Sequence, residues 1–482
     1  MSGRFDVADH NLCESWINGK GSSCSSEQID SIDPSTGAVF GSVNDGGREG
    51  VDDAVAAASR ALDGPWRTMG AGRRRELLSA WAAQVAEVTD QLARLEGLEV
   101  GRPVTDARAI NGLAPLFIEE CGRLAETLSQ SSDGTIYRPR GVVAAITPWN
   151  APVLNVILRA APSLATGNTL VLKPSELSPR SAVLLAQLAT NAGVPPGVFN
   201  VVLGTGLSAG APLAAHRDVA MVTFTGSTKT GQAIAREASV ASLKPLMMEC
   251  GGKSPQIVLP DMIDDPSLWA GVFTAAFWNT GQWCAAKSRL LVPKGRLSKA
   301  VEGLAEAAVS FRVGRPSDHA TYLGPIASRR QLHQVEHYQA RAREIAEVIA
   351  LPCPRGDVDA NGFYVTPEVV IRPPMNSAVV QEEVFGPLLT IHEYADLDEA
   401  VRLANATDYG LAASLWTSDH RVAERIADQI QAGLLTVLTS PSANTLLGGA
   451  GTFEPQKQSG YGVEGGLAGL RAYTAPQAIS FR

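Results

Sequence analysis

The sequence predicts an α/β protein with a doubly wound parallel sheet, a second α/β domain and a small β arm. Between residues 141 and 238, short apolar segments alternate four times with segments of helical periodicity. This alternation is typical of a parallel sheet covered by helices on both faces. The pattern starts again after Gly251-Gly252, and one short strand or arm is expected after Gly469.

The first sheet is expected to follow a largely helical region. Residues 15–45 contain short strands and turns, and apolar residues recur at helical spacing from residue 51 to about residue 127. Apolar runs then predict buried strands at 141–146, 169–172, 198–203 and 220–224. Helices are expected after residue 148 and at 181–192, 209–215 and 230–238.

The second α/β unit is predicted on the same grounds. Its strands are expected at 256–259, 289–292, 378–380, 390–392 and 413–416. Its helices are expected at 268–278, 299–309, 328–350, 397–405 and 423–429. Cys284 therefore belongs to a different domain from the first sheet.

Composition describes an ordinary globular chain of 482 residues, 45% hydrophobic and 19% charged. A net charge of −8 argues against a nucleic-acid or anionic-membrane partner. No apolar run reaches the ~18 residues needed to span a bilayer, and residues 1–13 lack the apolar core of a signal peptide. Six scattered cysteines (13, 24, 121, 250, 284 and 353) without a CxxC pair predict reduced thiols in the cytoplasm and no metal site.

Cys284 is a candidate nucleophile. It follows a glycine-containing turn and lies between apolar runs. A thiol does covalent chemistry as the thiolate, which requires access and nearby donors or positive potential. The alternative is a small buried hydrophobic residue, so the interpretation depends on motifs elsewhere in the chain.

Two motifs predict a phosphate and ribose site. Gly226-Ser227 follows a strand and opens a helix, where backbone N–H groups and the helix dipole bind phosphate. The alternative is an ordinary turn with an N-capping serine. Lys173 and Glu176 lie beyond the strand at 169–172, at the edge where doubly wound sheets bind ligands. The lysine and the carboxylate together could hold a ribose diol, and the Glu176 carboxylate would repel a 2′-phosphate, although a solvated ion pair is the alternative.

Three further motifs carry groups suited to catalysis. Asn150 follows the first buried strand and could donate to an oxyanion. Glu249 ends an apolar strand, where burial would raise its pKa and suit it to act as a general base. Glu382-Glu383-Val384-Phe385 combines acids with an aromatic residue in a turn. Taken alone, each has a simpler structural interpretation: a turn asparagine, an exposed strand end and a solvated loop.

Together and in this order, the motifs resemble the NAD(P)-dependent aldehyde dehydrogenase superfamily, over nearly the whole chain. The most specific segments are Pro148-Trp149-Asn150-Ala151-Pro152, Phe224-Thr225-Gly226-Ser227, Glu249-Cys250-Gly251-Gly252-Lys253-Ser254-Pro255, Gly281-Gln282-Trp283-Cys284 and Glu382-Glu383-Val384-Phe385-Gly386-Pro387. The resemblance implies a Rossmann-like NAD-binding domain at 1–121 and 141–249 and a catalytic domain at 250–450. It also implies an oligomerisation hairpin and arm at 122–140 and 466–482, in a homodimer or homotetramer.

The resemblance implies oxidation of an aldehyde to the carboxylic acid with NAD as the hydride acceptor. Cys284 would form a thiohemiacetal and then a thioester, while Asn150 and the Cys284 N–H would hold the oxyanion. Glu249 would activate the hydrolytic water, and Glu464 matches a second acid that relays protons in some members. The cofactor-binding residues implied are Thr147, Trp149, Lys173, Glu176, Gly206, Gly226, Ser227, Glu383 and Phe385.

The chain departs from the family pattern mainly where members shape the substrate entrance. Thr452-Phe453-Glu454-Pro455 and Val437-Leu438 are unusual there, the loop at 439–451 is long, and Cys250 replaces a leucine beside the base. The expected substrate-pocket residues are Ala151, Leu154, Leu158, Trp283, Ala285 and Phe453. Because they are mostly apolar and Arg159 is the one nearby cation, an uncharged apolar or aromatic aldehyde is expected.

Several alternatives stay open at this stage. A semialdehyde dehydrogenase would use the same chemistry on an acidic substrate. A CoA-acylating member usually lacks the glutamate, so Glu249 counts against it. A non-catalytic NAD-binding structural protein is disfavoured because Cys284, Glu249 and Asn150 occur together. NADP is the less expected cofactor because of the Glu176 carboxylate.

Overall fold

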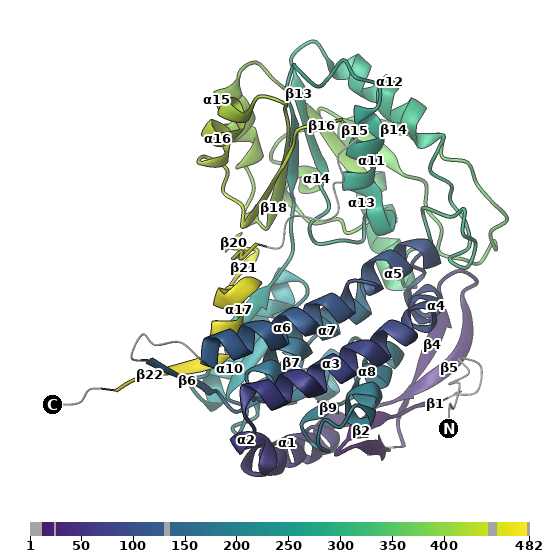
Figure 1. Ribbon diagram of the computed structural model, residues 1–482. Coiled ribbons are helices and arrows are strands. Elements are labelled where there is room, and N and C mark those ends of the chain that lie inside the picture. The colour runs from purple at the N-terminus through teal and green to yellow at the C-terminus, as the bar shows by residue number, and fades with distance from the viewer. Residues whose placement is uncertain (1–11, 24–25, 130–134, 442–450, 480–482) are drawn as a thin grey trace.

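The computed structural model describes residues 12–23, 26–129, 135–441 and 451–479. It contains two large sheets, and Figure 1 shows the first in the lower part of the molecule and the second in the upper part. Expectations on residues 1–11, Cys24, residues 130–134, residues 442–450 of the long loop and residues 480–482 lie outside the described residues. Among the described helices, none has the length and apolar character needed to cross a membrane.

The first sheet has eight strands in the order β21-β11-β10-β7-β8-β9-β2-β3. Its central strands run parallel: β7 (Val142–Ile146), β8 (Thr169–Lys173), β9 (Phe199–Val201), β10 (Met221–Thr225) and β11 (Leu246–Glu249). The edge strands pair antiparallel: β2 (Ser15–Ile17), β3 (Lys20–Ser22) and β21 (Gly460–Tyr461). Burial of every residue of β7 and β8 explains their continuous apolar sequences.

Helices cover both faces of this sheet. Val143 and Ala145 of β7 pack in one hydrophobic cluster with α3, α6, α7 and α8, whereas Val142 and Ala144 pack in another with α1, α9 and α10. The predicted Rossmann-like, doubly wound arrangement is therefore confirmed. The helices are α1 (Gly47–Asp63), α2 (Pro65–Thr68), α3 (Ala71–Glu87), α4 (Thr89–Val100), α5 (Val104–Asn111), α6 (Ala114–Ser129), α7 (Pro152–Ala165), α8 (Arg180–Asn191), η1 (Gly206–Gly210), α9 (Ala211–Ala215) and α10 (Thr228–Ala241).

The second sheet has seven strands in the order β14-β15-β16-β13-β12-β18-β19. All pair in parallel except β14: β12 (Pro255–Val258), β13 (Arg289–Pro293), β14 (Glu347–Ala350), β15 (Glu368–Ile371), β16 (Leu388–Tyr394), β18 (Ala412–Trp416) and β19 (Leu434–Leu438). The helical elements of this region are α11 (Leu268–Phe277), η2 (Trp278–Gly281), α12 (Leu297–Ala308), α13 (Arg329–Ile345), α14 (Ala378–Gln381), α15 (Leu397–Ala404) and α16 (His420–Ala427).

Two of the predicted elements are wrong. The expected strand at 378–380 is the short helix α14, because a three-residue apolar run has no period that separates strand from helix. The helix expected to reach residue 350 ends at Ile345, and residues 347–350 form β14. There the chain pairs antiparallel with β15, and this tertiary pairing overrides the local helical pattern.

Short strands join the ends of the chain to the rest of the fold. β1 (Leu12–Cys13), β5 (Ala38–Asn44) and β4 (Gln28–Asp33) form a three-stranded sheet, and β17 (Tyr409–Gly410) pairs with β20 (Gln456–Lys457). After α17 (Gly466–Ala472), β22 (Thr474–Ala478) pairs antiparallel with β6 (Thr135–Pro139). This β6–β22 pair extends away from the main body in Figure 1. The expected strand near the C-terminus is confirmed.

Candidate active site

The predicted cofactor residues meet at one edge of the first sheet. β7, β8 and β10 are parallel neighbours, so their carboxyl ends lie at one edge of the sheet. Thr147 and Gly226 directly follow β7 and β10, and Lys173 is the last residue of β8. The backbone N–H of Thr147 donates to the Lys173 carbonyl at 3.0 Å. The strand order reverses between β7 and β10, since β8 and β9 extend on the other side of β7. Such a switch point is where doubly wound sheets bind ligands.

The start of α10 has the geometry of an anion site. Ser227 is the N-cap, and its Oγ accepts a 3.3 Å hydrogen bond from the Thr230 N–H. The backbone N–H of Gly226 donates to the Glu249 carbonyl at 3.0 Å, which ties this turn to the predicted base. At Gly206, a Cβ would meet no atom within 4 Å, so open space lies beside this second glycine-containing turn.

Lys173 and Glu176 form the ion pair expected from the sequence, with 3.5 Å between Nζ and Oε2. The interpretation as a solvated surface pair is wrong for the lysine, because its side chain is only 3% exposed. Burial lowers the pKa of Lys173, and Glu176 partly offsets that shift. The Glu176 carboxylate is 38% exposed, so it is accessible to a ligand at this edge of the sheet.

The turn before Cys284 has an unusual backbone. Asn279, Thr280 and Gly281 all have positive φ angles of 51°, 58° and 72°. At Gly281 a Cβ would lie 2.4 Å from the Gly386 carbonyl oxygen, so only glycine fits. This turn directs the chain from α11 to Cys284, a residue of intermediate exposure.

Asn279 is a residue that the sequence motifs did not single out. Its Nδ2 donates to the backbone oxygen of Asn150 at 3.0 Å and to that of Gln282 at 3.2 Å. It therefore connects the turn of the predicted oxyanion donor to the loop of the predicted nucleophile. The one signal in the sequence is that asparagine, more than most residues, tolerates the left-handed conformation.

Gly252 brings the strand that carries Glu249 against the Cys284 backbone. A Cβ at Gly252 would lie 2.3 Å from the Cys284 carbonyl oxygen. Burial raises the pKa of the Cys284 thiol to about 12, and the charges of Glu383 and Glu249 add to the shift. The free thiol is therefore protonated at neutral pH, and a base must take its proton before it can attack a carbonyl.

Glu249 is buried at the end of β11, with 6% of its surface exposed, so the interpretation as an exposed strand end is wrong. Burial raises the pKa of Glu249 to about 8, although the positive charge of Arg159 lowers it in part. Its Oε1 accepts no hydrogen bond from the part of the chain that the structure describes. A carboxyl group with a pKa near neutrality and a free oxygen suits general-base chemistry.

Arg159 and Glu464 form an ion pair beside this base. Arg159 lies on α7 and is 2% exposed, and its Nη2 donates to Thr225 Oγ1 at 2.7 Å. Thr225 is the register partner of Glu249 on the adjacent strand. Glu464 is held by a two-way backbone bridge with Phe453, at 3.0 and 2.9 Å. The sequence identified Arg159 as a nearby cation, but not as the partner of Glu464.

Glu383 and Phe385 reach the same region from the second α/β unit. The Gly252 N–H donates to Glu383 Oε1 at 2.9 Å. Burial raises the pKa of Glu383 to about 7, while this hydrogen bond and the charge of Lys253 act in the opposite direction. The ring of Phe385 meets Trp149 edge-on with centroids 5.3 Å apart. These contacts join the 383–385 turn to the turn that carries Asn150.

The expected substrate residues start from the same two turns. Ala151 is the buried N-cap of α7, and Leu154 and Leu158 lie one helical turn apart with partial exposure. Trp283 packs edge-on against Trp278, with centroids 4.7 Å apart. Ala285 is the partly exposed residue after Cys284, and Phe453 is paired with Glu464. In the described ranges, no cluster of three or more His, Cys, Asp or Glu side chains is arranged to hold a metal ion.

The chain is similar to known proteins over nearly its whole length. The model of the aldehyde dehydrogenase family matches residues 21–479. The chain is 36% identical to aminoacetaldehyde dehydrogenase of Pseudomonas aeruginosa over 91% of this chain and 89% of that protein. It is also 36% identical to 2-hydroxymuconic semialdehyde dehydrogenase of Pseudomonas sp., over 94% of this chain and 95% of that one.

A solved structure extends the comparison to three dimensions. A variant of aldehyde dehydrogenase C from Pseudomonas syringae, crystallised with NAD+ and octanal, superposes with a TM-score of 0.89 and 36% identity over 98% of both chains. The family match and the aligned segments all extend over nearly the full length of the chain. The chain therefore belongs to the aldehyde dehydrogenase family and is an NAD(P)-dependent aldehyde dehydrogenase.

Proposed function

We propose that Cys284 is the nucleophile of aldehyde oxidation, Asn150 the side-chain donor to the oxyanion, and Glu249 the base for hydrolysis. The observation that carries this assignment is the hydrogen bond from Asn279 to Asn150, which ties the Asn150 turn to the Cys284 loop. Glu249 joins the same site through Gly252, whose small size allows the contact with the Cys284 backbone.

In this reaction the Cys284 sulfur attacks the carbonyl carbon, and the thiol proton passes to Glu249. The Asn150 amide and the Cys284 N–H donate hydrogen bonds to the thiohemiacetal oxygen, where negative charge develops. Loss of a hydride from the same carbon leaves a thioester. Glu249 releases the thiol proton to solvent and can then take a proton from the attacking water. The C–S bond breaks, the carboxylic acid leaves, and Glu249 returns this second proton to the Cys284 sulfur.

The cofactor site proposed is the edge formed by Thr147, Lys173, Gly226 and Ser227, with Gly206 beside it. When bound there, NAD supplies the nicotinamide ring that accepts the hydride. Three observations fit this group: the capped N-terminus of α10, the buried Lys173 beside Glu176, and the space at Gly206. Trp149, Glu383 and Phe385 are proposed to border the nicotinamide end.

We further propose NAD rather than NADP as the preferred cofactor. The Glu176 carboxylate is accessible and can accept hydrogen bonds from a ribose diol. A 2′-phosphate at that position would bring like charges together, which costs affinity.

The substrate proposed is an uncharged apolar or aromatic aldehyde. The side chains on the α7 face and beside Cys284 are apolar: Ala151, Leu154, Leu158, Trp283, Ala285 and Phe453. Arg159 is paired with Glu464, so it is not free to bind a substrate carboxylate. The names of relatives include an aminoaldehyde, a semialdehyde and octanal, so they do not choose a substrate class.

The domain limits and assembly are also proposed. Residues 1–121 and 141–249 would form the NAD-binding domain, residues 250–450 the catalytic domain, and residues 122–140 and 466–482 the oligomerisation hairpin and arm. The β6–β22 pair leaves strand edges that seek partners, which supports a homodimer or homotetramer. The free state of the five described cysteines supports a cytoplasmic location.

An aldehyde panel with NAD and with NADP tests these proposals. Benzaldehyde, octanal, succinic semialdehyde and an aminoaldehyde would be compared by kcat/KM from NADH or NADPH formation. We expect benzaldehyde or octanal with NAD to be preferred, and Cys284→Ala to abolish turnover without lowering Tm. A preferred semialdehyde would refute the substrate class, and a Cys284→Ala enzyme that still oxidised aldehydes would refute the nucleophile.

A further inference from the structure

A buried ion-pair network lies behind the turn that carries Asn150. Arg102 lies between α4 and α5, with Glu96 on the first helix and Asp106 on the second. Its Nη1 is 3.0 Å from Glu96 Oε2, and its Nε is 3.1 Å from Asp106 Oδ2. Arg102 and Glu96 are fully buried, and the Asp106 side chain is 18% exposed.

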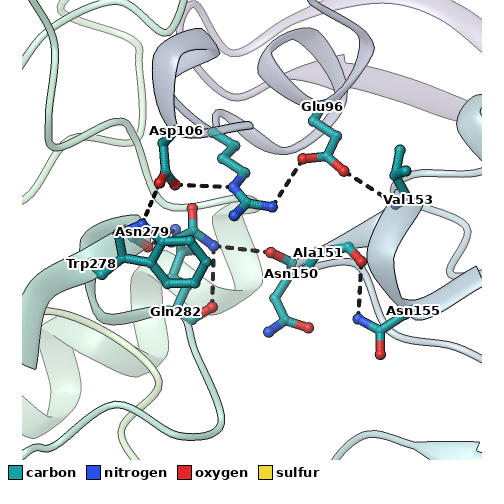
Figure 2. Close-up of polar contacts among 10 residues, drawn as sticks. Glu96, Asp106, Asn150, Ala151, Val153, Asn155, Trp278, Asn279 and Gln282 are labelled. Atoms are coloured by element: carbon teal, nitrogen blue, oxygen red, sulfur yellow. Dashed lines mark hydrogen bonds and ion pairs between the residues drawn. The ribbon is translucent and has the colours of Figure 1, made fainter. Parts of the chain in front are cut away.

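Each carboxylate of this network accepts a hydrogen bond from one of two turns: the turn that carries Asn150 and the turn that leads to Cys284. Oε1 of Glu96 accepts a 3.1 Å hydrogen bond from the Val153 N–H, in the first turn of α7 and three residues after Asn150. Oδ1 of Asp106 accepts a hydrogen bond from the Trp278 indole N–H, at the start of the turn that leads to Cys284. Figure 2 shows these contacts on either side of the Asn279–Asn150 hydrogen bond.

The contacts close into a ring. It runs from Asn150 along the backbone to Val153, then through Glu96, Arg102 and Asp106 to Trp278, and returns from Asn279 to the Asn150 carbonyl. A closed ring of buried and partly buried contacts restricts the Asn150 turn from two sides, whereas a single hydrogen bond would leave it free to rotate. The Arg102 guanidinium also lies 4.7 Å from the centre of the Trp278 ring.

We propose that Glu96, Arg102, Asp106 and Trp278 are positioning residues that set the distance between the Asn150 amide and the Cys284 loop. This inference rests on the proposed roles of Asn150 and Cys284 and adds the device that aligns them. The alignment matters most for acylation, because the oxyanion forms when sulfur bonds to carbon, and small displacements of a donor reduce the rate strongly.

The test is a double-mutant cycle between Trp278→Phe and Asn150→Ala. Trp278→Phe removes the indole donor to Asp106 and keeps an aromatic ring over Arg102. The measurement is the pre-steady-state burst of NADH with benzaldehyde or octanal, whichever the panel favours. We expect Trp278→Phe to lower the burst rate about 10- to 100-fold. In the Asn150→Ala background the same change should lower it less than about 2-fold, because the donor to be aligned is absent.

Trp81→Phe is the matched control. The Trp81 indole is also buried, and its N–H donates at 3.0 Å to the Leu185 carbonyl, between α3 and α8. The Trp81→Phe substitution should leave the burst rate unchanged. Asp106→Asn and Asp106→Ala provide a second measurement, since asparagine keeps an oxygen for the Trp278 N–H. The asparagine variant should retain a burst rate several-fold higher than the alanine variant.

The outcomes separate the two proposals. The positioning role would be overturned by an unchanged burst rate in Trp278→Phe, or by an equal loss from Trp278→Phe in the presence and absence of the Asn150 amide. Equal losses in Asp106→Asn and Asp106→Ala would also overturn it. An unchanged burst rate in Asn150→Ala alone would instead overturn the oxyanion role of Asn150. The expected pattern is a large loss in Trp278→Phe that disappears when Asn150 is already replaced.

Discussion

The backbone N–H of Gly252 donates a 2.9 Å hydrogen bond to the carboxylate of Glu383, which lies 131 residues further along the chain. The same glycine lies against the Cys284 backbone, where a Cβ would be 2.3 Å from the carbonyl oxygen. Gly252 thus connects the proposed base, the proposed nucleophile and the turn at 383–385. Much of the chemistry expected of this enzyme depends on that close approach.

Gly252→Ala should displace the Cys284 backbone and lower kcat at least about 100-fold, because nucleophile and oxyanion donors must stay aligned. The measurement is steady-state kinetics together with Tm. Gly70→Ala is the matched control, since a Cβ there meets no atom within 4 Å and φ is −65°. Equal activity of the two variants would contradict the role given to Gly252.

Glu249→Gln should slow thioester hydrolysis about 10²- to 10⁴-fold, the usual effect of losing a general base. It should also slow the NADH burst, because the thiol proton passes to Glu249 before the sulfur attacks the aldehyde. In the unmodified enzyme the hydrolysis rate should rise with pH through about 8, because the base acts as carboxylate and burial raises its pKa to that value. Single-turnover measurements between pH 6 and pH 9.5 would show this. A pH-independent hydrolysis rate would exclude Glu249 as the base.

The same substitution should change stability in a pH-dependent way. Glu249 has a raised pKa in the folded protein, so between about pH 4.5 and 8 the folded state holds a proton that the unfolded state has lost. Stability therefore falls as pH rises through this range. Glu249→Gln removes this loss, and its free energy of unfolding should exceed that of the original protein by more than about 1 kcal/mol at pH 8. Urea unfolding at pH 5 should show a smaller difference.

Arg159→Met should leave Glu464 without its buried partner and cost about 3–5 kcal/mol of stability. It should also move the pH dependence of hydrolysis to higher pH, because Arg159 lowers the pKa of Glu249. Arg159→Lys keeps the charge and is the control, which should shift the profile less. If the methionine and lysine variants had the same pH profile, the charge of Arg159 would have no influence on the base.

Glu176→Gln should reduce the preference for NAD over NADP by about 10-fold, because it removes the charge that would repel a 2′-phosphate. The quantity measured is the ratio of kcat/KM values for the two cofactors. The decrease in kcat/KM with NAD should be smaller, as a fold-change, than the increase in kcat/KM with NADP. An unchanged ratio would show that another residue selects the cofactor.

Some features of the fold could be predicted because they depend on local pattern. The strands β7 and β8 are continuous apolar runs since both faces of the sheet are covered, and their burial follows from the sequence alone. The short segment at 378–380 could not be assigned in this way, because Val379 and Val380 are buried in a helix as readily as in a strand. The strand β14 depends on its pairing with β15, which no local pattern contains.

The candidate site likewise has some features that the sequence predicts and others that it does not. Motifs around Cys284, Glu249 and Asn150 identify chemistry, because thiol, carboxylate and amide groups have distinct reactivity wherever they lie. Three features came from the tertiary structure: the link from Asn279 to Asn150, the pairing of Arg159 with Glu464, and the network around Arg102.

By itself, the sequence determined which reactive groups this protein has and which segments form the central strands of its first sheet. Only the tertiary structure decided how those groups are aligned and which charges they compensate. The physical reason is that reactivity belongs to single side chains, whereas alignment and pKa depend on burial and on partners that lie up to about 300 residues away along the chain, as Arg159 and Glu464 do.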